Sequence, residues 1–314
     1  MSSVRVRVPH LVALAAGVAV GLAACGGGAA PATTGSTAAI ASTTKATKKS
    51  IAPALCGTLR VRVAGRVTAP DATELSGLVA SPAQPGVLWA HNDSGDRARL
   101  FALRTDGSLI ASLDVPGAEA VDWEDIAVGP GDELLVGDIG DNDSARASID
   151  VYRVPEPRLA SGPAATAPAT RVRFTYPDGA HDAETLLADR RTGEVVVVTK
   201  RLDGRSGVYA GRLASGTLKR TGTLRLGLGG LATAGDVSAD GKVIAIRTYT
   251  ALYVWARSPG ATIAATLARP PCVGSARLAR EGQGESLALS GDGRSFFTVP
   301  EGASPRLRQY TTRK

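Results

Sequence analysis

Apolar and polar positions along the chain alternate in short strands separated by turns. One six-residue phrase recurs five times, beginning at Ser76, Glu124, Glu184, Gly235 and Glu285, with steps of 48, 60, 51 and 50 residues. A turn that contains glycine follows each phrase, and an apolar strand follows each turn. A repeat of about 50 residues built from strands and glycine turns is typical of a β-propeller.

The repeat also predicts how each unit folds. The first unit contains four candidate strands, at residues 78–80, 87–90, 100–104 and 110–113. Four strands make one propeller blade, and the units between residues 74 and 314 predict five blades. A sixth, degenerate blade is the alternative, within the Pro/Ala-rich insertion at residues 155–170 or around residues 257–280.

The two ends of the predicted domain complement each other. The last unit ends at residues 306–310, one strand short, and the segment at residues 59–67 alternates as a strand does. We expect this first strand to complete the last blade and close the ring without an open edge. The predicted fold class is therefore all-β, with a single β-propeller over residues 56–314.

The first 24 residues have the pattern of an export signal. Arg5 and Arg7 precede an apolar run at residues 11–24, which is too short for a retained membrane span. The run ends in Leu22-Ala-Ala-Cys25, which resembles a bacterial lipobox. The resemblance implies cleavage before Cys25, lipidation of its thiol and anchoring to the outer face of the cytoplasmic membrane. An ordinary secreted protein with a chance cysteine is the alternative.

The segment after Cys25 is predicted to be a flexible tether, over residues 25–55. Its Gly, Ala, Thr, Ser and Lys residues cannot bury enough apolar surface to offset the entropy of ordering. Five of the 36 basic residues precede residue 57, whereas all 29 acidic residues follow it. The predicted domain therefore has 31 basic and 29 acidic residues, which does not favour nucleic-acid binding. We expect a monomer.

Cysteine usage supports an exported protein. With Cys25 assigned to lipid, Cys56 and Cys272 are left in a compartment where disulfides persist. We predict a bridge between them, which would tie the start of the domain to a position near its end. Two separate buried thiols are the alternative.

Acidic residues gather where a propeller would bring strand ends to one face. Converging carboxylates repel one another unless some are protonated or a cation binds. Oxygen ligands suit Ca²⁺, and we predict a Ca²⁺ site at the channel mouth. The candidate ligands are Glu124, Glu184, Glu285, Asp138, Asp141 and Asn142. The alternative is that these residues form turns and that the glutamates pair with Arg247, Lys200 or Arg201.

Other polar residues of the same predicted face are candidates for ligand binding or catalysis. His91 and His181 are the candidates for a general base, although a histidine bonded to a loop carboxylate is the simpler interpretation. The candidate substrate-binding residues are Asn92, Asp93, Asp122, Asp182, Lys200 and Arg247.

Several phrases resemble a known group of bacterial propellers. The phrases beginning Glu74-Leu-Ser-Gly-Leu, Leu88-Trp-Ala-His-Asn-Asp and Asp122-Trp-Glu-Asp-Ile-Ala are similar to those of SdiA-regulated and TolB-like propellers, some described as phytase-like or esterase-like. The resemblance implies a channel-mouth metal at Glu124, Glu184, Asp138 and Asn142, although Asp125 stands where the family has Gly.

Two functions follow from this pattern. The first is a cell-surface lipoprotein that binds a small molecule or an envelope protein at a Ca²⁺-containing channel mouth. The alternative is a calcium-dependent hydrolase of phosphoesters, esters or lactones.

Overall fold

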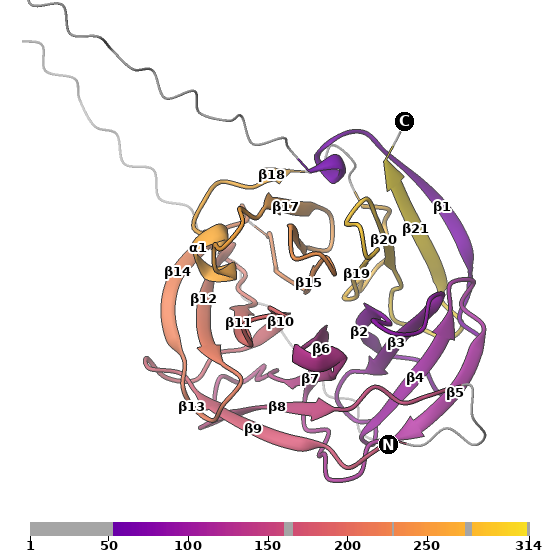
Figure 1. The fold of residues 1–314 in the computed structure, drawn as a ribbon, viewed down its shortest axis with the longest axis horizontal. Coiled ribbons are helices and arrows are strands. Elements are labelled where there is room, and N and C mark those ends of the chain that lie inside the picture. Colours follow the sequence, from indigo (N-terminus) through magenta and orange to yellow (C-terminus); the bar gives the residue numbers. More distant parts are fainter. Residues whose placement is uncertain (1–52, 160–165, 228, 274–277, 313–314) are drawn as a thin grey trace, which may run out of the picture. The chain divides into compact units, whose positions relative to one another are not determined.

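The computed structural model describes residues 53–159, 166–227, 229–273 and 278–312. Five sheets are arranged around a central axis as blades (Figure 1), each built on four antiparallel strands. These strands follow the chain from the axis outward, except that the first strand of the chain is the outermost strand of the last blade. The all-β class and the five blades are therefore confirmed. The predicted signal segment and Cys25 lie outside the described residues.

Each blade runs from an innermost strand beside the axis to an outermost strand at the rim. In that order, blade one contains β2 (Leu75–Ala80), β3 (Val87–Asn92), β4 (Arg99–Arg104) and β5 (Leu109–Asp114). Blade two contains β6 (Trp123–Val128), β7 (Leu134–Asp138), β8 (Ile149–Val154) and β9 (Thr170–Thr175). Blade three contains β10 (Ala183–Ala188), β11 (Glu194–Thr199), β12 (Arg205–Arg212) and β14 (Lys219–Arg225). Blade four contains β15 (Ala234–Val237), β16 (Val243–Arg247), β17 (Leu252–Ala256) and β18 (Cys272–Val273). Blade five contains β19 (Ala288–Leu289), β20 (Ser295–Thr298), β21 (Arg306–Thr312) and β1 (Leu59–Arg66).

The remaining elements are short. The 3-10 turns η1 (Ala54–Cys56) and η2 (Pro130–Asp132) flank strands, and α1 (Ile263–Leu267) lies between β17 and β18. Strand β13 (Gly216–Thr217) pairs in parallel with β9 and so extends blade two. No helix of the described residues is long and apolar enough to cross a membrane.

The six-blade alternative is wrong, because both candidate regions belong to the five blades. The segment after β17 forms α1 and β18 of blade four. The described residues of the Pro/Ala-rich insertion belong to the connection between β8 and β9, and residues 160–165 lie outside the described part.

The ring closes as the sequence predicts. Strand β1 pairs antiparallel with β21, from Leu59 opposite Thr312 to Arg66 opposite Arg306. A disulfide joins Cys56, just before β1, to Cys272 of β18, with 5.7 Å between the Cα atoms. This bond excludes the alternative of two free thiols, and it fastens the outer edges of blades four and five to each other.

The core lies between neighbouring blades. Five clusters of buried apolar side chains fill the five interfaces, for example Trp89 of blade one against Trp123 and Tyr152 of blade two. Both faces of every inner strand are therefore buried. This explains why apolar runs, rather than a strict alternation, mark these strands in the sequence.

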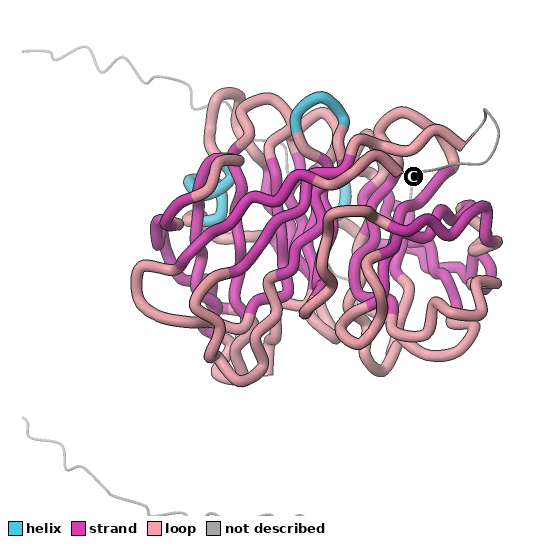
Figure 2. Tube along the Cα trace, turned by 90° about the horizontal axis from the view of Figure 1, so that it is seen from below, coloured by secondary structure: helices cyan, strands magenta, loops and turns pink. Residues whose placement is uncertain are grey.

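The strands run between two ends of the propeller, where the loops gather (Figure 2). The channel mouth is the end where the first strand of each blade begins and the second strand ends. At the opposite end, short hairpins join first and second strands.

One repeat is in a different register from the sequence-based alignment. Hairpin bonds run from Asp189 N to Glu194 O in blade three and from Ser238 N to Val243 O in blade four. The structure therefore aligns Thr233, rather than Gly235, with Glu184. The sequence alignment was wrong at this repeat because Asp240, which resembles the end of a phrase, is a turn residue whose carboxylate accepts bonds from Ser238 and Lys242.

Candidate functional site at the channel mouth

First strands place glutamates at the mouth through local irregularities in pairing. The register of β6 against β7 shifts between Trp123 and Asp125, and that of β10 against β11 shifts between Ala183 and Thr185. Glu124 and Glu184 occupy these two irregular positions. A bulge re-aims the side chain of its extra residue. This geometry is how the repeat delivers two buried carboxylates to the same space.

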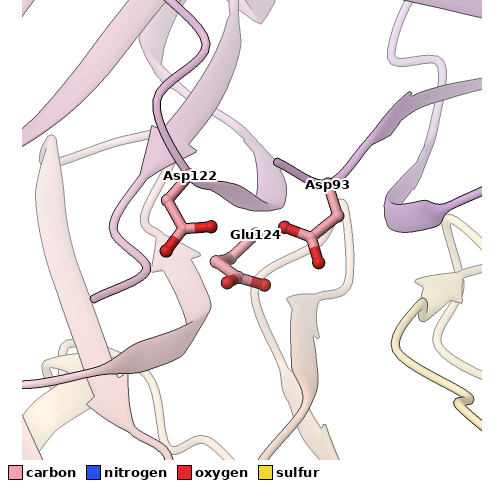
Figure 3. Close-up of side chains that lie close together, drawn as sticks. All are labelled: Asp93, Asp122 and Glu124. Atoms are coloured by element: carbon pink, nitrogen blue, oxygen red, sulfur yellow. The ribbon is translucent and has the colours of Figure 1, made fainter. Parts of the chain in front are cut away.

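Three carboxylates meet at the centre of the site. Possible ligand oxygens of Asp93, Asp122 and Glu124 lie within 4.8 Å of one another. Figure 3 shows Asp93 and Asp122 approaching Glu124 from opposite sides. Asp93 follows the second strand of blade one, whereas Asp122 and Glu124 come from the start of blade two. Asp122 lies just before β6 and Glu124 lies at its bulge, so the bulge rather than regular strand alternation brings the two carboxylates together.

Two further groups extend this centre. Glu124 also forms a group with Asp182 and Glu184, and Asp93 forms one with Glu285 and Glu301, again within 4.8 Å. We call the combined set the carboxylate cluster, which comprises Asp93, Asp122, Glu124, Asp182, Glu184, Glu285 and Glu301.

Burial and mutual repulsion make these groups hard to ionise. Burial and the nearby charges of Asp93 and Asp182 raise the pKa of Asp122 to about 6. Burial and the charges of Asp93 and Asp122 raise the pKa of Glu124 well above its usual range. Burial and a hydrogen bond with Glu285 raise the pKa of Glu301 to about 8. A cation bound among these carboxylates would offset their repulsion and favour their ionised forms.

Lys200 neutralises part of the cluster. Its ammonium pairs with the carboxylate of Glu184 and lies 3.6 Å from Oε1 of Glu285. The hydroxyl of Tyr249 donates to the same Oε1 over 2.6 Å. Oε2 of Glu184 is buried without a hydrogen-bond partner among the described residues, so the cluster retains acceptor capacity that the protein does not use.

The donor set fits a hard divalent cation. Ca²⁺ takes six to eight oxygen ligands, and Asp93, Asp122 and Glu124 offer carboxylate oxygens from two blades. Lys200 lies on the Glu184 and Glu285 side of the cluster, so Asp93 and Asp122 make no ion pair with it. Asp93, Asp122 and Glu124 are therefore the best candidates to hold a metal.

Other predicted metal ligands lie outside this cluster. The Asp138 carboxylate pairs with Arg146 over 2.8 Å and accepts backbone N–H bonds from Val121 and Asp122. The Asp141 carboxylate caps the following turn by accepting the N–H groups of Ala145 and Arg146. Asn142 is exposed. It lines a cleft of about 550 Å³ with Asp182 and Lys200.

The predicted substrate-binding residues divide into two sets. Asp93, Asp122, Asp182 and Lys200 belong to the cluster or contact it. By contrast, the Asn92 amide is buried and donates to Asp71 O and to Asp96. Arg247 is fully buried and pairs with Glu281 over 3.1 Å. Asn92 and Arg247 therefore hold loops in place.

Neither histidine is hydrogen-bonded to the carboxylate cluster in the described part of the chain, although Nε2 of His91 is buried without a partner there. His91 is fully buried, with Nδ1 2.9 Å from Asn92 O and its ring edge-on to Trp123. Burial lowers the pKa of His91 to about 4, so its ring is neutral near pH 7. His181 bonds to Asp178 over 3.0 Å and to the Tyr209 hydroxyl over 2.8 Å. His181, bonded to the Asp178 carboxylate, matches the simpler interpretation from the sequence. His91 does not, because it lies in β3 and its ring contacts a backbone oxygen rather than a carboxylate.

Sequence reasoning did not select Glu301 or Tyr249 as site residues. Tyr249 and Glu301 come two and three residues after the second strands β16 and β20, in loops that correspond to those of Asp93 and Lys200 in blades one and three. The repeat itself carried that signal.

No protein-family model matches the chain, and no curated protein matches it. Among solved structures, a gluconolactonase of Xanthomonas campestris is similar at 15% identity, with a TM-score of 0.44. The aligned region covers 81% of this chain and 90% of the gluconolactonase chain. Hydrazine synthase of Kuenenia stuttgartiensis is similar at 12% identity, with a TM-score of 0.38, over 72% of this chain and 61% of its own. The RRP9 WD40 repeats are similar at 13% identity, with a TM-score of 0.38, over 76% of this chain and 67% of their own. At these scores, the similarity carries no argument about activity.

Proposed function

We propose that the channel mouth binds one divalent cation, for which Ca²⁺ is the best fit, and uses it to hold a small anionic molecule. The observation that carries this proposal is the convergence of Asp93, Asp122 and Glu124 within 4.8 Å. Burial raises the pKa of each of them, because the folded chain lacks enough positive charge at this point.

The ligand would bind beside the cation, in the cleft lined by Asp182, Lys200 and Asn142. Lys200 offers an ammonium to an anionic group, and the exposed Leu202 offers an apolar contact. A cleft of about 550 Å³ is large enough for a small organic molecule. We therefore infer a small anion rather than an extended polymer.

Hydrolysis of a phosphoester, ester or lactone is the second candidate, favoured by the position of Asp182. This carboxylate belongs to the cluster and also lines the cleft, so it could accept a proton from a bound water. A bound cation would polarise the substrate oxygen. His91 is too buried for such a role.

The proposal extends to the location of the protein. The lipobox-like segment at Cys25 and the disulfide between Cys56 and Cys272 together support an exported, membrane-anchored propeller. Labelling with radioactive palmitate tests the anchor, and Cys25→Ser should abolish the label.

Thermal unfolding with Ca²⁺ and with chelator tests the metal site. At 100 times its dissociation constant, a ligand stabilises the folded state by about 2.7 kcal/mol. Glu124→Gln should abolish this shift, whereas Glu119→Gln, which removes an exposed carboxylate, should retain it. An equal shift in both variants would show that Ca²⁺ binds elsewhere. If the shift is as expected, a screen of ester and lactone substrates with Asp182→Asn then tests hydrolysis.

A further inference from the structure

A second cleft lies at the end of the propeller opposite the channel mouth. It has a volume of about 570 Å³ and is lined by the first hairpin and third strand of blade three and by the segment of blade four before α1. We call it the Arg257 cleft. Its charged lining residues are Arg191, Arg212, Lys219, Arg257, Asp189 and Glu194.

Arg257 is buried at this cleft with part of its hydrogen-bonding capacity unused. Its Nη2 pairs with the Asp189 carboxylate, and its Nε donates to Ala261 O over 2.7 Å. The side chain is only 3% exposed. Its Nη1 is buried and has no hydrogen-bond partner among the described residues. A buried guanidinium N–H without an acceptor is costly, so this atom calls for an acceptor that is not part of the protein.

A second guanidinium faces the same space. A Cβ placed on Gly241 would lie 3.5 Å from Nη1 of Arg257 and 3.6 Å from Nη2 of Arg191. Both guanidinium groups thus lie beside Gly241, which places Nη1 of Arg257 and Nη2 of Arg191 close to each other. Arg191 is largely exposed and reaches the Asp189 carboxylate only at 3.9 Å. Its charge is therefore available to a ligand.

The acids of the cleft are already bonded. The Asp189 carboxylate also accepts a hydrogen bond from the backbone N–H of Arg191 over 2.9 Å. The Glu194 carboxylate accepts the N–H groups of Ile263 and Ala264 at 2.7 and 3.1 Å. Four cationic and two acidic side chains line the cleft, so positive charge remains in excess there.

We propose that the Arg257 cleft binds the carboxylate or phosphate group of a small organic anion. Arg257 Nη1 and Arg191 would donate to its oxygens, because guanidinium groups match the geometry of both oxyanions. Ala210, Gly211 and Ala261 line the rest of the cleft and leave room for the body of the ligand. This site is independent of the metal proposed at the channel mouth.

Calorimetric titration of the full chain with inorganic phosphate, and separately with acetate, tests the proposal at matched ionic strength. We expect saturable binding of at least one probe, weakened about tenfold or more in Arg191→Gln. Arg294→Gln is the matched control, since it removes an exposed cation from the corresponding hairpin of blade five. Its affinity should stay within about twofold of the unchanged protein.

Three further outcomes are decisive. Arg257→Lys keeps the charge beside Asp189 but removes the free Nη1, so a folded variant should also bind more weakly. Arg191 is largely exposed, so its variant stays informative even if Arg257→Lys fails to fold. The absence of saturable binding of both probes would overturn the proposal. Equal loss in Arg191→Gln and Arg294→Gln would also overturn it, because it would show unspecific attraction between charges.

Discussion

Lys200 and Glu285, which belong to the non-adjacent blades three and five, meet at the channel mouth with 3.6 Å between Nζ and Oε1. Lys200 also pairs with Glu184, a buried carboxylate of its own blade. One ammonium thus joins two blades across the mouth and offsets part of the repulsion within the carboxylate cluster.

Replacement of Lys200 by methionine should destabilise the metal-free protein and increase the stabilisation by Ca²⁺. The change leaves Glu184 buried without its partner, a loss of roughly 3 kcal/mol. The extra negative charge then favours a cation more strongly. Arg201→Met is the control, because Arg201 pairs with Asp203 at the surface and should cost less than about 1 kcal/mol. Urea unfolding with and without Ca²⁺ measures both effects, and a smaller Ca²⁺ effect in Lys200→Met would contradict this account.

Asp236 should make the protein less stable as pH rises towards neutrality. Its carboxylate is buried and accepts N–H bonds from Val237 and Leu289 at 2.7 Å. Burial raises the pKa of Asp236 to about 7 in the folded protein, against about 3.9 in an unfolded chain. The folded state therefore binds more protons between these values. The contribution of Asp236 to the free energy of unfolding is complete below about pH 4 and is lost as pH rises through about 7.

Denaturant unfolding in chelator at several pH values isolates this effect. Asp236→Asn cannot titrate, so the free energy of unfolding of the unchanged protein should fall relative to that of the variant between pH 4 and 7. Asp292→Asn, in an exposed turn, should keep the slope of the unchanged protein over the upper part of this range. If Asp236→Asn keeps that slope as well, Asp236 is not the group responsible.

The disulfide should contribute strongly to stability. Cys56 and Cys272 are 216 residues apart, and the chain-entropy model gives about 5 kcal/mol for a loop of this length. The double variant Cys56→Ser with Cys272→Ser should lose most of this amount while keeping the β-sheet circular dichroism spectrum. Adding reductant to the unchanged protein should have the same effect. A loss below about 1 kcal/mol would show that the pairing of β1 with β21 closes the ring by itself.

Gly77 should be intolerant of a methyl group because His91 occupies the space above it. A Cβ at Gly77 would lie 2.1 Å from Nε2 of His91. We expect Gly77→Ala to destabilise by about 1–3 kcal/mol through overpacking. Gly222→Ala is the control, since nothing lies within 4 Å of its added Cβ. Similar melting temperatures for the two variants would mean that His91 can move aside.

The fold could be predicted from the sequence because every blade has the same requirements for its strands and turns. Each first strand needs apolar residues on both faces, and each hairpin needs a turn residue, so the pattern recurs with the blade. The pairing of β1 with β21 followed because an open edge would otherwise remain. The alignment of the repeat that begins at Gly235 shows the limit of prediction from sequence. It was misplaced because an aspartate in a turn resembles an aspartate that ends a strand.

The site was harder to predict because side-chain partners depend on loops that do not repeat. Glu124 and Glu184 could be found from their position at the start of a first strand. Asp138 occupies a comparable place at the end of a second strand, but Arg146 in the following loop pairs with its carboxylate. His91 has a loop-like sequence context, yet it is the penultimate residue of β3 and points into the interface with Trp123.

Calorimetric titration of Ca²⁺ into the chelator-treated protein tests the central claim most directly. Our account predicts saturable binding of about one ion per chain, lost in Asp122→Asn and in Glu124→Gln but retained in Glu119→Gln. It also predicts weaker binding as pH falls below 6, because burial and neighbouring charge raise the pKa of Asp122 to about 6 and protons then compete with the ion. Saturable binding that survives in both Asp122→Asn and Glu124→Gln, or no binding at any pH, would contradict it.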